Sequence, residues 1–346
     1  MAGTGKAHLR SGSDIILRVE DLVVEFKTKG GVVHAVSGIS LDVRQGETLG
    51  LVGESGCGKS TTGRAIMQLP PPTSGHVLFE GKDLASLNGR ELRELRTHLQ
   101  FIFQDPISSL NPRRKVKDIV AEPLRIWKRG TDAEQKARVA EVLDAVGLDP
   151  AVASEKRPHQ FSGGQCQRIS IARSLVLEPQ VVICDEPVSA LDVSVQAQIL
   201  NLLEDMKARY GLTLIFIAHD LAVVKNISDR VAVMYLGKIC EVGSPDDLYA
   251  TPAHPYTAAL LRSIPVPDPT VPPVQTGLLV GDLPSPIDPP AGCRFRTRCP
   301  LAQERCALEE PQVRAVGPEH YVACHFPLLG PVAGAAHPVE VSASAP

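Results

Sequence analysis

Residues 53–60 read Gly-Glu-Ser-Gly-Cys-Gly-Lys-Ser, a complete G-x-x-x-x-G-K-S phosphate-binding loop. Thr48 to Val52 before the loop is a short apolar run that predicts a buried strand, and residues 61–67 after it can continue as a helix. Successive backbone N–H groups at the positive end of such a helix can surround a phosphate. We expect Lys59 to reach the β- and γ-phosphates and the Ser60 hydroxyl to ligate Mg²⁺. The stretch therefore predicts an α/β fold that binds a nucleoside triphosphate.

Two further apolar runs end in polar residues. Val181 to Cys184 predicts a second buried strand, and Asp185 and Glu186 follow it. Because the carboxyl ends of parallel strands meet a ligand crevice, we expect Asp185 to hold the Mg²⁺ shell and Glu186 to orient or deprotonate the attacking water. Leu212 to Ala218 predicts a third strand, and His219 follows it in the order expected for a residue that senses the γ-phosphate.

With these motifs in order, residues 15–262 resemble the ATPases of ABC transporters. Residues 161–165 (Phe-Ser-Gly-Gly-Gln) are similar to the signature motif of that family, Gln104 to its Q-loop glutamine, and residues 189–192 (Ser-Ala-Leu-Asp) to its D-loop. The resemblance implies a head-to-tail dimer in which the signature loop of each subunit covers the phosphate loop of the other.

The resemblance also implies a role for each motif residue. It assigns hydrolysis to Glu186, His219 and Gln104, and the Mg²⁺ ion to Ser60, Gln104 and Asp185. Phe26 falls where the family stacks an aromatic ring on adenine, although an aromatic there can equally belong to the core. The other residues expected to bind ATP are Gly53, Ser55, Gly56, Cys57, Gly58, Lys59, Ser60, Thr61, Gln104, Asp185 and His219. Those expected to complete the site of a partner are Ser162, Gly163, Gly164, Gln165 and Asp192.

The likeness narrows to the peptide-importer branch of the family. Residues 103–106 (FQDP), 109–112 (SLNP), 217–224 (IAHDLAVV) and 254–257 (HPYT) resemble that branch, and residues 164–168 (GQCQR) resemble its F-type subunit. This implies import of dipeptides or oligopeptides, with a D-type ATPase subunit, two permeases and an extracytoplasmic peptide-binding protein as partners. Nickel or another small solute as the cargo, and a soluble ABC ATPase with no transport role, are the alternatives.

The composition argues against a nucleic-acid-binding, membrane-spanning or secreted protein. The 346 residues carry a net charge of −3, so no global basic field points to nucleic acid. No apolar stretch approaches the roughly 20 residues that span a bilayer. Residues 1–13 lack the apolar core of a signal peptide. We therefore expect a peripheral protein on the cytoplasmic side of the cell membrane, where permeases provide its only membrane contact.

The chain is expected to divide into five parts. A disordered N-terminus (1–14) precedes the ATPase domain (15–262), in which residues from about 105 to 178 form a helical signature subdomain. A proline-rich linker (263–292) leads to a small Cys-rich module (293–328) and a disordered tail (329–346). The predicted fold class is thus a P-loop NTPase of ABC type, with a mixed sheet core, an antiparallel β subdomain and this terminal module.

Four cysteines lie close together near the end of the sequence. Cys293, Cys299, Cys306 and Cys324 follow the pattern C-x5-C-x6-C-x17-C. Disulfides are rare in the cytosol, so four thiols here point to a metal, either Zn²⁺ or an iron–sulfur cluster. The resemblance favours a 4Fe–4S cluster, because residues 292–295 and 298–300 look like the cluster-holding segment of peptide-importer ATPases. Zn²⁺ is the alternative.

Overall fold

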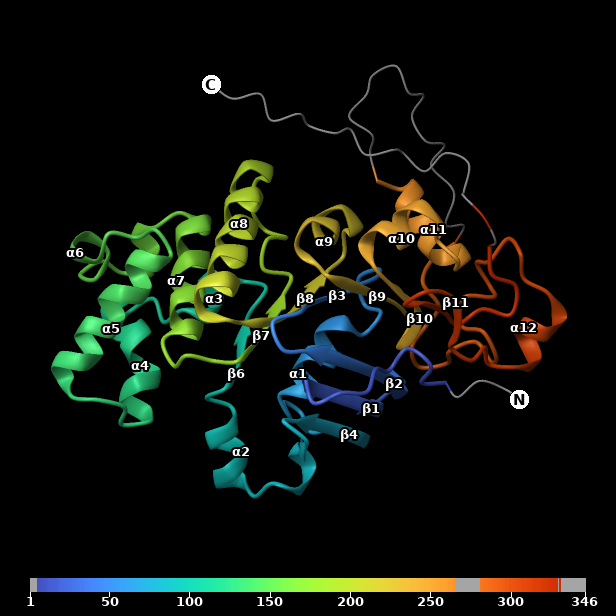
Figure 1. Ribbon diagram of the computed structural model, residues 1–346, viewed down its shortest axis with the longest axis horizontal. Coiled ribbons are helices and arrows are strands. Elements are labelled where there is room, and N and C mark those ends of the chain that lie inside the picture. The colour runs from blue at the N-terminus through green and yellow to red at the C-terminus, as the bar shows by residue number, and fades with distance from the viewer. Residues whose placement is uncertain (1–4, 265–280, 329, 331–346) are drawn as a thin grey trace, which may run out of the picture.

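Two β-sheets organise the chain in the computed structural model, which describes residues 5–264, 281–328 and 330 (Figure 1). The smaller sheet is antiparallel, with strand order β2-β1-β4-β5. The larger sheet is mixed, with strand order β11-β12-β10-β9-β3-β8-β7-β6. This arrangement confirms the predicted α/β architecture with a mixed core and an antiparallel subdomain.

The smaller sheet contains β1 (Ile15–Thr28), β2 (Gly31–Arg44), β4 (Ser74–Phe79) and β5 (Lys82–Asp83). The larger sheet contains β3 (Thr48–Val52), β6 (Leu99–Ile102), β7 (Val181–Asp185), β8 (Thr213–Ala218), β9 (Arg230–Tyr235), β10 (Lys238–Gly243), β11 (Arg314–Gly317) and β12 (His320–Val322). The helices are α1 (Lys59–Ile66), α2 (Gly89–Leu95), α3 (Pro106–Ser109), α4 (Val116–Ile126), α5 (Asp132–Ala145), α6 (Pro150–Ala153), α7 (Gly163–Leu175), α8 (Val193–Tyr210), α9 (Leu221–Ile227), α10 (Pro245–Ala250), α11 (Pro255–Arg262) and α12 (Glu304–Leu308). Two short 3-10 helices are η1 (Leu84–Ser86) and η2 (Pro158–Gln160).

The parallel centre of the larger sheet positions the candidate site. Strands β3, β7 and β8 are buried at every residue, as expected for strands covered on both faces. Their register places Val52 opposite Ala218, and Asp185 opposite Ile217. The residues that follow these three strands therefore emerge side by side at one edge of the sheet.

Helices α3 to α7 form a region of their own at one end of the molecule (Figure 1). They lie within the stretch from about residue 105 to 178, for which the sequence predicts a helical subdomain. Helix α5 begins at a capping box in which Thr131 and Glu134 bond to each other's backbone N–H groups. The helical spacing of apolar residues over 132–146 predicts a helix there, and the bounds of α5 agree with it to within one residue.

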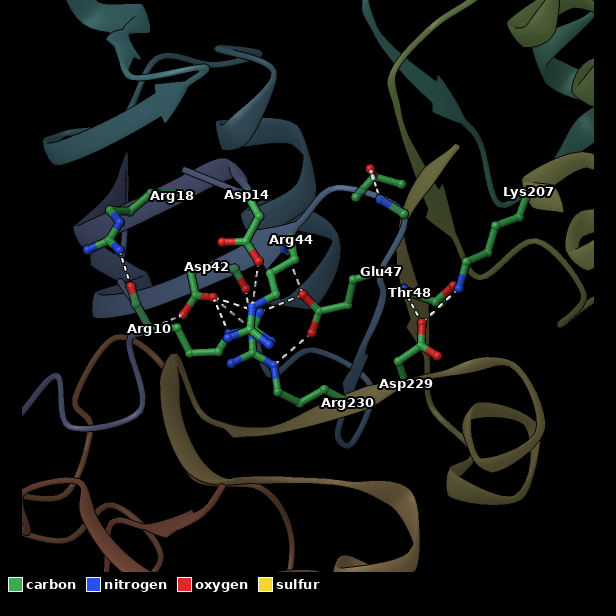
Figure 2. Close-up of polar contacts among 12 residues, drawn as sticks. Arg10, Asp14, Arg18, Asp42, Arg44, Glu47, Thr48, Lys207, Asp229 and Arg230 are labelled. Carbon is green, nitrogen blue, oxygen red and sulfur yellow. Dashed lines mark hydrogen bonds and ion pairs between the residues drawn. The ribbon is translucent and has the colours of Figure 1, made fainter. Parts of the chain in front are cut away.

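The N-terminal segment differs from the expected disorder over residues 1–14. Residues 1–4 lie outside the described part, but the segment after them packs onto strand β2. His8 is buried and its Nε2 lies 2.6 Å from the Ser40 carbonyl oxygen. Arg10 forms ion pairs with Asp42 and Glu47, at 2.7 and 2.5 Å (Figure 2). Both carboxylates are buried, so the cation is held where charge pairs are strongest.

The C-terminal segment also differs from an independent module. Strand β12 pairs antiparallel with β10, so residues 293–328 extend the large sheet rather than form a separate body. Pairing covers the edge of β10, which would otherwise present unpaired backbone groups. Of the expected linker, residues 265–280 lie outside the described part, and of the expected tail only Gly330 lies within it.

A buried charge network joins the two sheets and provides a test of stability. Arg230 Nε donates to Glu47 at 3.0 Å and its Nη2 lies 3.3 Å from Asp42, whose side chain is fully buried. The variant Arg230→Met should unfold with a free energy lower by about 3 kcal/mol, because it leaves the two buried carboxylates of Asp42 and Glu47 to share the single Arg10 cation. Urea titration of the purified chain measures this change.

Lys207→Met is the matched control. Lys207 pairs with Asp229, whose side chain is more than half exposed, and the expected loss is below about 1 kcal/mol (Figure 2). An equal loss in the two variants would contradict the importance assigned to the buried network.

Candidate nucleotide-binding site

The phosphate loop joins strand β3 to helix α1, as the sequence predicts. Gly58 caps α1 with a left-handed φ of 105°. A Cβ atom at Gly58 would lie 2.2 Å from the Ala35 carbonyl oxygen of β2, so the backbone approach leaves no room for a side chain. The loop is therefore pressed against the smaller sheet, and its N–H groups lie at the positive end of α1.

Lys59 brings a buried positive charge to this loop. Its ammonium group donates to the carbonyl oxygens of Gly53 at 2.7 Å and Glu54 at 3.0 Å. It also lies 3.9 Å from a carboxylate oxygen of Glu186. The side chain is only 3% exposed, so water screens its charge weakly. This is the arrangement needed to attract the terminal phosphates of a nucleotide.

Ser60 and Asp185 meet beside Lys59 and fit a Mg²⁺ ion. The Ser60 hydroxyl donates to Asp185 Oδ1 at 2.5 Å. Asp185 is fully buried, and its Oδ2 is buried with no hydrogen-bond partner among the described residues. Burial raises the pKa of Asp185, and the hydrogen bond from Ser60 opposes that rise. A hydroxyl beside an unsatisfied carboxylate oxygen is the oxygen donor set that Mg²⁺ prefers.

The three residues expected to support hydrolysis lie together. Glu186 Oε2 accepts a hydrogen bond from Gln104 Nε2 at 3.0 Å and lies 3.4 Å from His219 Nδ1. Glu186 adopts a left-handed φ of 46°, and its N–H donates to the Ile217 carbonyl oxygen. Residues other than glycine rarely adopt this backbone conformation, and those that do are often found at functional sites. The amide of Gln104 bonds to Glu186, and no hydrogen bond in the described residues joins it to Ser60 or Asp185.

The D-loop begins beside this cluster, since the Ser189 hydroxyl donates to the Glu186 carbonyl oxygen at 3.1 Å, whereas the signature residues and Asp192 have other partners. Ser162 caps helix α7 and shares a capping box with Gln165. A Cβ atom at Gly164 would lie 2.5 Å from Val195 Cγ1, so a larger residue at this contact between helices α7 and α8 would require the Val195 side chain to move. No hydrogen bond or ion pair in the described ranges links Ser162–Gln165 or Asp192 to the Lys59 and Glu186 cluster. Ser162 and Asp192 are exposed.

The remaining predicted ATP-binding residues have more limited contacts. Phe26 lies on β1 and is 38% exposed, so its ring is open to a planar ligand. Cys57 is buried, and burial raises the pKa of its thiol to about 11, so the side chain is a neutral packing group. Only the main chain of Cys57 can face a phosphate. The roles of Ser55, Gly56 and Thr61 stay predictions.

Sequence reasoning missed the contacts that fix the loop from outside. The Glu54 N–H donates to the Tyr256 hydroxyl of α11 at 2.8 Å, and the Arg64 guanidinium lies 3.7 Å from Asp185 Oδ2. Glu54 and Tyr256 are separated by 202 positions in the chain. A local sequence pattern cannot predict a contact between residues so far apart in the chain. Arg64, by contrast, lies on the helix that the phosphate-loop motif predicts, so its contact with this site could have been found.

The four terminal cysteines line one cavity, together with Phe295 and His325. Its volume is about 10 Å³, the size of a single water site. The pKa of the Cys324 thiol is raised to about 12, mainly by burial and in smaller part by the neighbouring cysteines. Among residues 5–264, 281–328 and 330, no group of three or more His, Cys, Asp or Glu side chains is arranged to hold a metal ion. The expected 4Fe–4S cluster is therefore not supported by this geometry.

His320, which lies near these cysteines in the sequence, has another partner. Its Nε2 lies 2.7 Å from Glu241 Oε1, in a buried pair that holds strand β12 to β10.

Comparison with known proteins decides the family. The family model described as ABC transporter matches residues 36–189, and the one described as the C-terminal region of oligopeptide/dipeptide transporters matches residues 240–306. The chain is 51% identical over 324 residues to the oligopeptide transport ATP-binding protein OppF of Escherichia coli, covering 90% of this chain and 96% of that one. It is 50% identical over 309 residues to a putative peptide import ATP-binding protein of Brucella ovis, covering 89% and 97%.

This chain is an ABC transporter ATP-binding protein. It belongs to the oligopeptide/dipeptide transporter type, and it is an ATPase. The ABC fold is shared with solved structures. That of cbiO1 from Clostridium perfringens aligns with a TM-score of 0.61 and 32% identity, over 68% of this chain and 91% of that one. The dimeric cassette MJ0796 bound to ADP and Pi aligns with a TM-score of 0.60 and 28% identity, over 66% and 98%.

The described part of this ABC ATPase contains no helix with the length and apolar character needed to cross a membrane.

Glu186 is the first residue of the ABC ATPase to test. Glu186→Gln should keep nucleotide binding and lower the ATPase rate of the assembled complex by a factor on the order of 10². The amide keeps a side chain of the same shape beside Gln104 but cannot take a proton from water. Steady-state phosphate release and equilibrium nucleotide binding measure the two effects.

Glu94→Gln on the exposed surface of α2 is the matched control and should leave both quantities unchanged. Near-normal turnover in Glu186→Gln would remove Glu186 from its assigned role. His219→Ala should also lower turnover.

Proposed function

We propose that this chain is the ATP-hydrolysing subunit that energises import of peptides across the cytoplasmic membrane. The observation that carries the proposal is the cluster in which Glu186, Gln104 and His219 meet beside the Lys59 ammonium group. The match of residues 240–306 to the C-terminal region of oligopeptide/dipeptide transporters supports peptides as the cargo, rather than nickel or another small solute. The names of both relatives support the same cargo.

Different residues of this chain bind the phosphates, hold the Mg²⁺ ion and activate the attacking water. The N–H groups of residues 56–60 and the Lys59 ammonium group bind the phosphates, and Ser60 and Asp185 hold the Mg²⁺ ion that neutralises their charge. Glu186 orients the water that attacks the γ-phosphorus and accepts its proton. The bond from that phosphorus to the β–γ bridging oxygen then breaks, which yields ADP and phosphate. Gln104 and His219 hold the Glu186 carboxylate in place through the contacts described above.

A second cassette completes each site. Ser162 and Asp192 are exposed, and no hydrogen bond or ion pair among the described residues joins Ser162–Gln165 or Asp192 to Lys59 or Glu186, which supports a role at a nucleotide held by another subunit. The solved structure of MJ0796 bound to ADP and Pi is dimeric. We propose that the partner here is a D-type ATPase subunit, and that the pair docks on two permeases served by an extracytoplasmic peptide-binding protein. In this proposal the chain is a peripheral subunit on the cytoplasmic face of the membrane.

We propose the same domain boundaries that the sequence predicts, except for the C-terminal segment. The ATPase domain keeps its proposed bounds of 15–262 and its helical subdomain from about 105 to 178. The segment 293–328 is proposed as an extension of that domain, since β12 continues the large sheet.

The 4Fe–4S cluster remains a proposal about the four cysteines. Its support is the resemblance of residues 292–295 and 298–300 to the cluster-holding segment of peptide-importer ATPases, and the cavity that all four cysteines line is where a cluster would have to fit. The small volume of that cavity means that the thiols must separate before they can bind four irons. Zn²⁺ is the alternative metal.

The pairing proposal predicts that this chain is a poor ATPase by itself. Assembly with the D-type subunit and permeases should raise its rate at least about tenfold, because each site then gains a signature loop. Peptide-loaded binding protein should raise it further. Ser162→Ala should slow the assembled complex but leave ATP binding by the isolated chain unchanged. Robust, cooperative hydrolysis by the isolated chain as a homodimer would refute the pairing.

The cluster proposal predicts about four irons per chain, with a broad thiolate-to-iron absorption band, after anaerobic purification. Metal analysis by mass spectrometry and the visible spectrum measure this. Cys299→Ser should lose the band, whereas Cys166→Ser, buried in α7, should keep it. Protein that contains stoichiometric zinc, or no metal, would contradict the cluster.

A further inference from the structure

Glu54, the second residue of the phosphate loop, forms a bidentate ion pair with Arg298 of the C-terminal extension. Arg298 Nη1 donates to Glu54 Oε2 at 2.6 Å, and Nη2 donates to Oε1 at 3.0 Å. The Arg298 side chain is 5% exposed and that of Glu54 is 26% exposed. A bidentate pair of this kind is stronger and more directional than a single ion pair. The site that holds ATP and the extension that holds the four cysteines are therefore in direct contact.

The protein fixes the Arg298 end of this contact. Arg298 Nη1 lies 3.4 Å from the Tyr235 hydroxyl, and its guanidinium carbon lies 5.8 Å from the centre of the Tyr235 ring. The backbone N–H of Arg298 donates to the Phe295 carbonyl oxygen. Phe295 is almost fully buried and packs on Tyr235 and Tyr256, with ring centres 5.2 and 5.4 Å apart. The guanidinium group is thus held by a packed aromatic cluster.

Glu54 is itself hydrogen-bonded to other residues of the phosphate loop. The Glu54 N–H donates to the Tyr256 hydroxyl, and its carbonyl oxygen accepts from the Lys59 ammonium group and from the Cys57 N–H. Glu54 also carries a negative charge in a loop that must receive phosphates. Pairing with Arg298 cancels that charge and fixes the backbone that holds Lys59.

We propose that Arg298 is a positioning residue for ATP binding, which acts through Glu54 to hold the phosphate loop in the shape that accepts the nucleotide. This deepens the proposed function and rests on it, since it requires that ATP binds at Lys59. Arg298 is not a catalytic residue, because no described contact joins it to Glu186, Gln104 or His219.

The proposal predicts a change in affinity rather than in the chemical step. In the assembled complex, Arg298→Ala should raise the KM for MgATP about tenfold and change kcat by less than about twofold. The isolated chain should lose ATP affinity by the same factor in equilibrium titration. Arg298→Lys keeps the charge but loses the two-pronged geometry, so it should lie between wild type and Arg298→Ala.

A double-variant cycle separates this pair from a general loss of structure. Glu54→Gln and Arg298→Gln should each weaken ATP binding, and the double variant should bind no more weakly than the worse single variant. Arg305→Ala is the matched control from the same extension, because the ion pair that Arg305 forms within the described residues is with the exposed Glu309. It should leave KM and kcat unchanged.

The outcomes distinguish the two proposals. If wild type binds ATP and Arg298→Ala binds it equally well, the positioning role is wrong and the proposed function stands. Equal loss of kcat and of folded protein at unchanged KM would also overturn the positioning role. If wild type does not bind ATP, the proposed function itself fails.

Discussion

The parallel pairing of β8 with β3 on one side and with β7 on the other is the constraint on which the site depends. Because Val52 lies opposite Ala218 and Asp185 lies opposite Ile217, the phosphate loop, Glu186 and His219 leave the sheet at the same edge. A shift of one residue in either pairing would turn the side chains of that strand to the other face. The complete burial of the three strands strongly disfavours such a shift. The Ser60–Asp185 and Glu186–His219 contacts are consequences of this register.

A second set of contacts holds the phosphate loop from outside the parallel strands. Gly58 is pressed against β2, while Tyr256 and Arg298 hold Glu54 from α11 and from the C-terminal extension. The extension is in turn fixed to the sheet by the β10–β12 pairing and by the buried Glu241–His320 contact. A change in the extension can therefore reach the nucleotide site through a short, well-packed route. Cys299 follows Arg298 directly, so the chemistry of the cysteine cavity lies next to that route.

The sequence predicted the parts of the molecule in which local pattern and function coincide. The phosphate loop, the acidic pair after β7 and the histidine after β8 each follow a short apolar run, so strand and site could be recognised together. Helix α5 was predicted because the helical spacing of its apolar residues is a local pattern. The contacts that were missed join residues far apart in the chain. Arg10 with Asp42, Glu54 with Arg298, and β12 with β10 depend on packing that no local spacing reports. For this reason the described structure differs from the disorder expected over residues 1–14, and strand β12 of the expected C-terminal module belongs to the large sheet.

The coupling of ATP hydrolysis to peptide movement is the central claim, and proteoliposomes test it most directly. The purified complex of this chain, its D-type partner and two permeases would be reconstituted with MgATP inside the vesicles. Labelled peptide and binding protein would be added outside. The account predicts that peptide accumulates against its gradient with ATP inside, and that no accumulation occurs with a non-hydrolysable analogue. Accumulation that is equal with ATP and with the analogue, or ATP hydrolysis with no peptide uptake, would contradict it.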